Sequence, residues 1–375
     1  MKNGLWIGIF TALCAALIFV GVRFAKETGL LVKYPEPAYL SSEETELRPV
    51  YEQLSKKEQA VYEALLRGIS DHDEKISLPY EISGDAYSKI YCILEKQEGQ
   101  LFYIDSTYYT AEKIREAKII YRDDKEKIPE MQSELDMAVE NALGGVTLAA
   151  GEYDAVMRIH DYLIDNCEYV IGDENGYSST AYGCLVEKKA NCEGYAKAFG
   201  LLASEVGIKN ILVTGVTDKG ENHAWNQVLV NGSWYNIDVT WDDIGVAGDA
   251  GRLYFLCNDM DFGRTHVPDG KYFEPFVCDD SEENFYVANN LLADSLEDAD
   301  DILRREIRKG SSEINIKFET DDVYNSFKQR YIAQEYIFEV IFEERWEYTE
   351  QMEISVRENA QERCLSVYLK WVGKN

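Results

Sequence analysis

The chain has 375 residues, and its 68 acidic against 38 basic side chains give a formal net charge of −30 at pH 7. An acidic balance of this size excludes nucleic acids and anionic membrane surfaces as electrostatic partners, because both repel it. The eight cysteines are irregularly spaced, with no Cys-x-x-Cys pair, and do not resemble a disulfide scaffold. Buried thiols are therefore expected, with one disulfide among Cys167, Cys184, Cys257 and Cys278 left open.

Residues 5–22 form an unbroken apolar run without a charged side chain, and Lys2 precedes it. As a helix, about 18 residues would extend about 27 Å, near the lower limit for crossing a bilayer. The chain continues Arg23-Phe24-Ala25-Lys26, which fits a signal-peptidase site poorly. We therefore predict an uncleaved signal anchor, a single transmembrane helix in residues 1–30; cleavage would instead give a secreted protein.

The next two segments are predicted to be a linker and a small α/β module. Residues 31–50 contain prolines, serines and several glutamates, a composition typical of a linker. The module, residues 51–130, should have helices at 56–69 and 85–95, and strands at 75–81, near 101–109 and at 118–122. A connecting helix at 130–143 is expected to lead into a catalytic domain over residues 131–285.

A helix predicted at 154–165 carries His160 and Asp161, a dipeptide that also occurs in metal-dependent phosphohydrolases. Such sites need several more ligands, and among the four histidines only His72 and His266 remain as spare candidates. We interpret His160 as a structural hydrogen-bonding residue. The Asp-rich segments do not place oxygen ligands at the alternating positions of a calcium loop, so no metal and no other cofactor is expected.

Cys192 is predicted to stand at the beginning of a helix. Apolar residues follow it at three- and four-residue steps: Tyr195, Ala196, Phe199, Leu202, Ala203 and Val206. Gly207 then provides a stop signal. The unpaired backbone N–H groups and the dipole of a helix N-terminus favour a thiolate, and the same N–H groups can hold a developing oxyanion.

Residues 223–241 are predicted to form a β-hairpin around Asn231-Gly232, the dipeptide that best tolerates a type I′ turn. A two-residue loop sets Val230 opposite Ser233. Continuing this register sets position 225 opposite Asp238 and His223 opposite position 240. His223 and Asp238 then lie on one face as diagonal neighbours, whereas a loop longer or shorter by one residue would separate them.

Two tryptophans are predicted on the same face of this hairpin as His223, either in the core or as walls of a substrate groove. We expect Trp234 in the core and leave Trp225 open between the two.

Together the three polar residues have the parts of a catalytic triad. Taken alone, each has a structural interpretation: a buried thiol, a satisfied strand histidine and a strand-end cap. Taken together, they match a thiol that needs an imidazole to take its proton and a carboxylate to fix the imidazole's tautomer. The acyl donor would be an amide, and water or an amine would resolve the thioester.

Three motifs resemble the transglutaminase-like (papain-like) superfamily: Asn-Cys-Glu-Gly-Tyr-Ala-Lys-Ala-Phe at 191–199, His-Ala-Trp-Asn at 223–226 and Trp-Tyr-Asn-Ile-Asp-Val-Thr-Trp-Asp-Asp at 234–243. The chain is most similar to the bacterial, mostly surface-anchored branch, and the resemblance extends over roughly 133–280 through segments 159–163, 182–185 and 254–256. It implies Cys192 as nucleophile, His223 as base and Asp238 as its orienting carboxylate. It also implies an α+β fold, in which a helix carrying the cysteine packs on an antiparallel sheet, and an extracytoplasmic body.

The sequence departs from the family pattern at two positions beside the triad. Asn191 stands where many members have Gly or Val, and Val239 replaces a frequent Pro. The oxyanion side and the substrate groove are therefore open, with Trp225 and Tyr182 as candidates for lining them.

The last segment, residues 286–375, is expected to form a second α/β module. Its predicted elements are a helix at 293–309, a strand at 313–319, a helix from 322 to about 342, and strands at 351–357 and 363–371. Residues 76–81 and 85–87 parallel residues 314–319 and 322–324 when one gap is allowed. Either two related modules flank the catalytic domain, or similar patterning arose independently.

These features predict a membrane-anchored thiol enzyme, a peptidase, amidase or transamidase, acting on proteins or peptides of the cell envelope. The alternative is a catalytically silent binding or scaffold protein of the cell surface. The presence of Cys192, His223 and Asp238 favours the enzyme.

Overall fold

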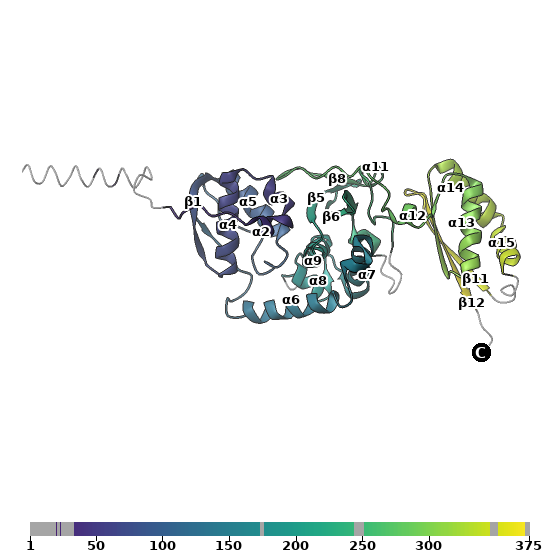
Figure 1. Ribbon diagram of the computed structural model, residues 1–375, viewed down its shortest axis with the longest axis horizontal. Helices are drawn as coiled ribbons and strands as arrows, with labels where there is room; N and C mark the ends of the chain where they lie inside the picture. Colours follow the sequence, from purple (N-terminus) through teal and green to yellow (C-terminus); the bar gives the residue numbers. More distant parts are fainter. Residues whose placement is uncertain are drawn as a thin grey trace, which may run out of the picture. The chain divides into compact units, whose positions relative to one another are not determined.

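The computed structural model describes residues 34–172, 176–243, 251–345 and 352–371, together with Val20 and Arg23 (Figure 1). The chain divides into two compact units, the first built on Leu54–Leu94 and Asp105–Ile120 and the second on Ser42–Gln53, Glu95–Ile104 and the chain after Tyr121. Apart from Val20, the predicted membrane anchor lies outside the described residues. Among the residues that are described, none belongs to a helix with the length and apolarity needed to cross a bilayer.

The first unit has a helix–strand–helix order followed by one more strand. Helix α4 (Lys56–Ser70) begins with a capping box between Ser55 and Glu58, and it packs on strand β1 (Lys75–Ser83). Helix α5 (Gly84–Gln97) follows, and strand β2 (Lys113–Lys118) pairs antiparallel with β1. The strand predicted at 118–122 is therefore found five residues earlier.

The strand predicted near 101–109 is wrong. Residues 101–104 belong to the second unit, where Leu101, Phe102, Tyr103 and Ile104 are all buried and only Ile104 makes an isolated bridge, to Tyr121. A short apolar run buried on all sides has the same pattern as a buried strand, so its period does not distinguish the two.

Part of the expected linker is folded. Helices α2 (Ser42–Glu46) and α3 (Pro49–Glu52) belong to the second unit, and Val50 and Tyr51 are buried there. Arg48 lies next to α3, and its Nε is 2.6 Å from an Oε of the buried Glu98. Ser42 begins α2 and Pro49 begins α3, so these residues mark helix starts rather than a linker. The linker prediction for 31–50 is therefore wrong from residue 42 onwards.

The central part of the second unit places helices against an antiparallel sheet. The helices are α6 (Ile128–Ala142), the 3-10 turn η1 (Leu148–Ala150), α7 (Glu152–Asn166), α8 (Ala181–Leu185) and α9 (Cys192–Glu205), with the short parallel pair β3 (Glu168–Tyr169) and β4 (Lys189–Ala190) between them. The sheet has the order β7-β6-β5-β8, from strands β5 (Asn210–Thr217), β6 (Asn222–Val230), β7 (Ser233–Ile237) and β8 (His266–Pro268). Helix α9 packs on β5 and β6 through Ala196, Leu212 and Ala224, with Cys192 at the edge of this contact. A helix carrying the cysteine therefore lies on the sheet that carries the histidine.

The predicted hairpin is confirmed in its turn and register. Val230 pairs with Ser233, and both loop residues have positive φ, 50° at Asn231 and 92° at Gly232. The pairing stops at Ile237, because the next residue already caps helix α10 (Val239–Asp242). The predicted continuation that set His223 opposite position 240 is therefore wrong; His223 pairs only with Gly215 of β5.

The C-terminal part has a four-stranded sheet in the order β11-β12-β10-β9, with helix α13 against it (Figure 1). After helices α11 (Asp259–Phe262) and α12 (Phe285–Ala288), its elements are β9 (Leu292–Ala293), α13 (Leu296–Lys309), β10 (Glu313–Phe318), α14 (Asp321–Phe327), the π-helix η2 (Lys328–Ala333), α15 (Ile337–Glu344), β11 (Met352–Asn359) and β12 (Cys364–Trp371). The single helix predicted from 322 to about 342 is thus interrupted, and Glu335 takes a positive φ of 59° at the break. Among the described residues the first unit has only the pair β1-β2, so the two flanking parts differ in strand order, as independent origins of the pattern would give.

Candidate active site

Cys192 is the first residue of α9, and the residues around it are held by the turn before the helix. The Asn191 side chain accepts hydrogen bonds from the backbone N–H groups of Glu193 at 3.1 Å and Gly194 at 3.2 Å. A Cβ at Gly194 would lie 2.2 Å from the carbonyl oxygen of Ser178, so only glycine allows this loop to approach the helix. The sequence predicted that backbone N–H groups at this helix start could bind an oxyanion. The Asn191 side chain occupies those of Glu193 and Gly194, and it does not use that of Cys192.

An ion-pair cluster fixes the first turn of α9 from the other side. Glu193 lies 2.9 Å from the buried Lys197 and 3.1 Å from Lys96, and Lys197 also contacts the buried Glu95 at 2.5 Å. Burial alone would raise the pKa of Glu193, but the two lysines lower it to about 2. The helix turn that carries Cys192 is therefore tied at a charged and largely buried cluster.

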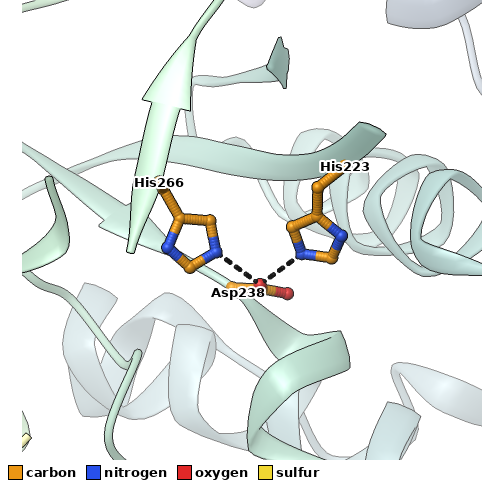
Figure 2. Close-up of side chains that lie close together, drawn as sticks. All are labelled: His223, Asp238 and His266. Carbon is orange, nitrogen blue, oxygen red and sulfur yellow. Dashed lines mark hydrogen bonds and ion pairs between the residues drawn. The ribbon is translucent and has the colours of Figure 1, made fainter. Parts of the chain in front are cut away.

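His223 lies on β6 and is only 8 % exposed. Its Nε2 is 2.6 Å from an Oδ of Asp238 (Figure 2). The Cys192 thiol also hydrogen-bonds with this imidazole. Burial alone would lower the pKa of His223, but the charge and hydrogen bond of Asp238, and then those of Cys192, raise it to about 10. The imidazolium form is therefore favoured at neutral pH.

Asp238 is buried and accepts four hydrogen bonds. One carboxylate oxygen accepts from the backbone N–H groups of Thr240 at 3.0 Å and Trp241 at 3.2 Å, and the other contacts His223 at 2.6 Å and His266 at 3.1 Å. Burial alone would raise the pKa of this carboxyl, but His223 and then His266 hold it well below its usual range. Asp238 is thus both the helix cap and the partner of an imidazole.

His266 is the residue of this site that sequence reasoning missed. It lies on β8, 28 positions after Asp238, and reaches the carboxylate because β8 pairs with β5. The sequence marked it only as a spare histidine, since no motif surrounds it. The signal that could have found it is a long-range strand pairing, which periodicity does not show.

His223, Asp238 and His266 form the one group in the described part of the chain with the composition and spacing of a metal site. Their ligand atoms all lie within 4.8 Å of one another, and two imidazoles with a carboxylate suit zinc or iron. Both Nε2 atoms, however, already lie at hydrogen-bonding distance from the same carboxylate oxygen. Direct hydrogen bonds therefore satisfy the cluster, and it needs no ion.

The two residues predicted to line a groove or the oxyanion side are buried. Trp225 is 2 % exposed and packs against Phe262 and His266. Tyr182 stacks on Phe102 with ring centroids 4.8 Å apart, and its hydroxyl donates to Glu134. Neither ring is placed on an open surface by this structure.

Trp234, expected in the core, is only partly buried and stacks on Phe276 with centroids 4.1 Å apart. Trp234 therefore does not lie in the core as expected, whereas Trp225, which was left open, is buried. The exposed aromatic residue at the site is instead Tyr169, which is 46 % exposed. Burial first, and then the charges of Cys192, Asp238 and Glu221, raise its pKa.

His160 is confirmed as a structural hydrogen-bonding residue. It is buried, with Nδ1 3.0 Å from Asp161 and Nε2 3.1 Å from Asp242, the last residue of α10. Burial alone would lower its pKa, but these two carboxylates raise it. The Tyr195 hydroxyl, 2.6 Å from Asp243, ties the same loop to α9. These contacts fix the short helix whose cap is the triad carboxylate.

The described cysteines are free thiols, five of them fully buried, so the disulfide left open among Cys167, Cys184, Cys257 and Cys278 is not formed in the structure. Cys192 and Cys92 are the two described cysteines with intermediate exposure.

Comparison with known proteins supports one family. The sequence profile of the transglutaminase-like superfamily matches residues 142–239. The chain is 30% identical to the human kyphoscoliosis peptidase over 146 residues, which are 33% of this chain and 22% of the relative, and 31% identical to the mouse protein over 108 residues, 24% and 16% of the two chains. The chain thus spans about a fifth of the length of these relatives.

Solved structures resemble the chain only distantly. A TGase crystal structure is 18% identical with a TM-score of 0.27, covering 32% of this chain and 34% of the other. A candidate cysteine protease from Cytophaga hutchinsonii is 21% identical with a TM-score of 0.24, covering 32% and 43%. At these TM-scores the fold similarity is not significant, and the sequence match alone supports a transglutaminase-like domain. On that match, residues 142–239 form a transglutaminase-like domain.

Proposed function

We propose that this chain is a thiol enzyme that breaks or exchanges amide bonds of proteins or peptides, with Cys192 as nucleophile, His223 as base and Asp238 as orienting carboxylate. The observation that carries the proposal is the order of contacts: the imidazole lies between thiol and carboxylate, bound to Asp238 through Nε2 and interacting with Cys192. This is the arrangement that an activated thiol requires.

The proposed reaction begins with a Cys192 thiolate and a His223 imidazolium. The sulfur attacks the amide carbonyl carbon, a C–S bond forms, and the carbonyl oxygen takes the negative charge beside the backbone N–H of Cys192, which the Asn191 cap does not use. The imidazolium then gives its Nδ1 proton to the amide nitrogen as the C–N bond breaks. The products of this half-reaction are a thioester and an amine.

The second half-reaction restores the thiol. A water molecule or an amine attacks the thioester carbonyl while neutral His223 takes a proton from the attacking group, and the C–S bond breaks. Water gives a carboxylic acid and an amine gives a new amide. The exclusion of water from the site decides between hydrolysis and transamidation. Offering an amine donor together with a glutamine peptide, with Cys192→Ala as control, separates the two by product mass.

We further propose that residues 5–22 anchor the protein in the membrane as a single span, with the body extracytoplasmic, as in the bacterial surface-anchored branch. Proteins or peptides of the cell envelope are then the substrates. The uninterrupted apolar run supports this placement. Protease added to intact cells should degrade the body, and a body protected until the cells are lysed would contradict the proposed orientation.

A second candidate is a silent binding or scaffold protein that keeps the fold without turnover. The partly exposed Cys192 together with its histidine and carboxylate favours the enzyme, because a scaffold has no need of a buried imidazolium beside a thiol.

Thiol labelling tests activity without knowledge of the substrate. The full chain is treated with iodoacetamide at neutral pH, and mass spectrometry of its peptides follows each cysteine. Cys92 is a matched internal reference, since it is also of intermediate exposure but contacts only a tyrosine hydroxyl, at 3.9 Å. Cys192 should react at least about tenfold faster than Cys92, and His223→Ala should remove the difference. Equal rates for the two cysteines in the native chain would refute the proposed activation.

A further inference from the structure

Two imidazoles share one carboxylate oxygen in this site. His266 approaches the Asp238 oxygen that His223 also contacts, and Figure 2 shows the two rings on either side of it. A triad needs only one imidazole, so the second one is not explained by the proposed reaction. His266 is 1 % exposed and therefore does not reach a substrate.

The surroundings of His266 determine which of its nitrogens carries a proton. The Thr265 hydroxyl lies 2.9 Å from Nδ1, whereas its other acceptor, the Phe262 carbonyl, is 3.4 Å away. A hydroxyl that donates to Nδ1 leaves the proton on Nε2, which faces Asp238.

Two imidazoles approach one carboxylate at this site. The titratable groups that face His266 are Asp238, His223 and Tyr254. The ring centroids of the two histidines are 5.4 Å apart, and both Nε2 atoms lie at hydrogen-bonding distance from the same oxygen of Asp238. With Nδ1 facing the Thr265 hydroxyl, Nε2–H is the group that His266 donates to this oxygen.

Aromatic rings hold the imidazole in this orientation. Phe262 stacks on it with centroids 4.0 Å apart, and Trp241 lies at 4.5 Å. A donor fixed in this way stabilises one position of the carboxylate oxygen and takes up part of its charge.

We propose that His266 is a positioning residue for the thiol chemistry: as a neutral Nε2–H donor it fixes the Asp238 carboxylate that orients His223. This role rests on the proposed function and acts only through Asp238. Without the donor, the carboxylate charge falls more fully on His223, which then holds its proton more tightly and delivers it less readily.

A nitrogen NMR experiment tests the protonation state separately from any activity. The full chain, labelled with ¹⁵N only in histidine, has four imidazoles, which single replacements assign. At neutral pH the His266 signals should show a protonated Nε2 and an unprotonated Nδ1. A proton on Nδ1, alone or together with Nε2, would overturn the proposal.

Two substitutions test the role of the donor. His266→Phe keeps a flat ring between the aromatic side chains but removes the proton donor, while His266→Gln fits less well but supplies an N–H. The rate of Cys192 carboxymethylation by iodoacetate is measured against pH, because this anion reacts fastest while His223 is protonated. The rate falls at high pH as His223 loses its proton, which gives the alkaline limb of the pH–rate profile. We expect His266→Phe to move this limb to higher pH, by about one pH unit for a tenfold change in the proton affinity of His223. His266→Gln should return the limb towards its native position.

The outcomes distinguish a donor role of His266 from a purely packing role of its ring, and from failure of the proposed enzyme function. A native-like limb in a folded His266→Phe protein, or an equal displacement in both variants, would refute the donor role. Thermal unfolding of both variants identifies a merely structural effect, which lowers the melting temperature and leaves the limb in place. A native Cys192 no more reactive than Cys92 would instead reject the proposed function, and the NMR result would still decide the protonation of His266.

Discussion

Replacing Asp238 by asparagine removes one negative charge from the centre of the site and keeps the number of heavy atoms the same. The asparagine oxygen can still accept from the backbone N–H groups of Thr240 and Trp241, so the cap of α10 is preserved. Its NH₂ group then faces two imidazole Nε2 atoms that donated to a carboxylate. To avoid opposed donors, His223 must turn to the tautomer that protonates Nδ1, and this form cannot accept the proton of Cys192.

The size of the effect follows from the charge that the imidazolium loses. A pKa raised from 6.5 to about 10 corresponds to about 5 kcal/mol in favour of imidazolium, most of it from Asp238. Without that carboxylate, burial disfavours the charged ring. We expect alkylation of Cys192 at neutral pH to fall by about 10² to 10⁴-fold, the upper value being the size seen when a triad histidine is held in the wrong tautomer.

The assay is the iodoacetamide rate of Cys192 relative to Cys92 in the same chain. Asp269→Asn is the matched control, because Asp269 also follows a strand of this sheet but is exposed and bonds only with Thr214 and a neighbouring backbone N–H. The control should keep the native rate. A folded Asp238→Asn protein that alkylates within about threefold of the native rate would show that the carboxylate does not activate the imidazole.

Three further predictions concern the parts that support the site. Gly194→Ala should destabilise the fold by about 1–3 kcal/mol in urea unfolding, because its Cβ would meet the Ser178 carbonyl oxygen at 2.2 Å; Gly144→Ala, whose Cβ would meet no atom closer than 3.3 Å and whose φ is not positive, is the control. Lys197→Met should cost about 3 kcal/mol, since it removes the buried partner of Glu95 and Glu193 and leaves only Lys96 beside these two carboxylates, and an unchanged urea midpoint would contradict this. The pKa of His160 is raised in the folded state, so its stabilising effect is full below pH 6.5 and is lost as pH rises. The stability difference between native protein and His160→Gln should therefore shrink as the pH rises above 6.5, and a constant difference would refute the reasoning.

The local features of the site could be predicted because local chemistry determines them. The period of apolar residues after Cys192 and the stop signal at Gly207 predicted a helix beginning at or near Cys192, and α9 begins there. The Asn231-Gly232 turn sets the register of β6 and β7, and with it the face that His223 occupies. Both signals depend on residues a few positions apart, which the sequence displays directly.

The sequence by itself thus determined the helix start and the hairpin register, and it predicted Cys192, His223 and Asp238 as a triad. Only the tertiary structure decided that Asp238 ends the hairpin as a helix cap, that Trp225 is buried, and that a second histidine shares the carboxylate. The physical reason is that each of these depends on contacts between distant segments: β8 reaches the site through β5, and the burial of Trp225 depends on Phe262. Contacts of this kind leave no periodic trace in the sequence, because their partners come from separate elements.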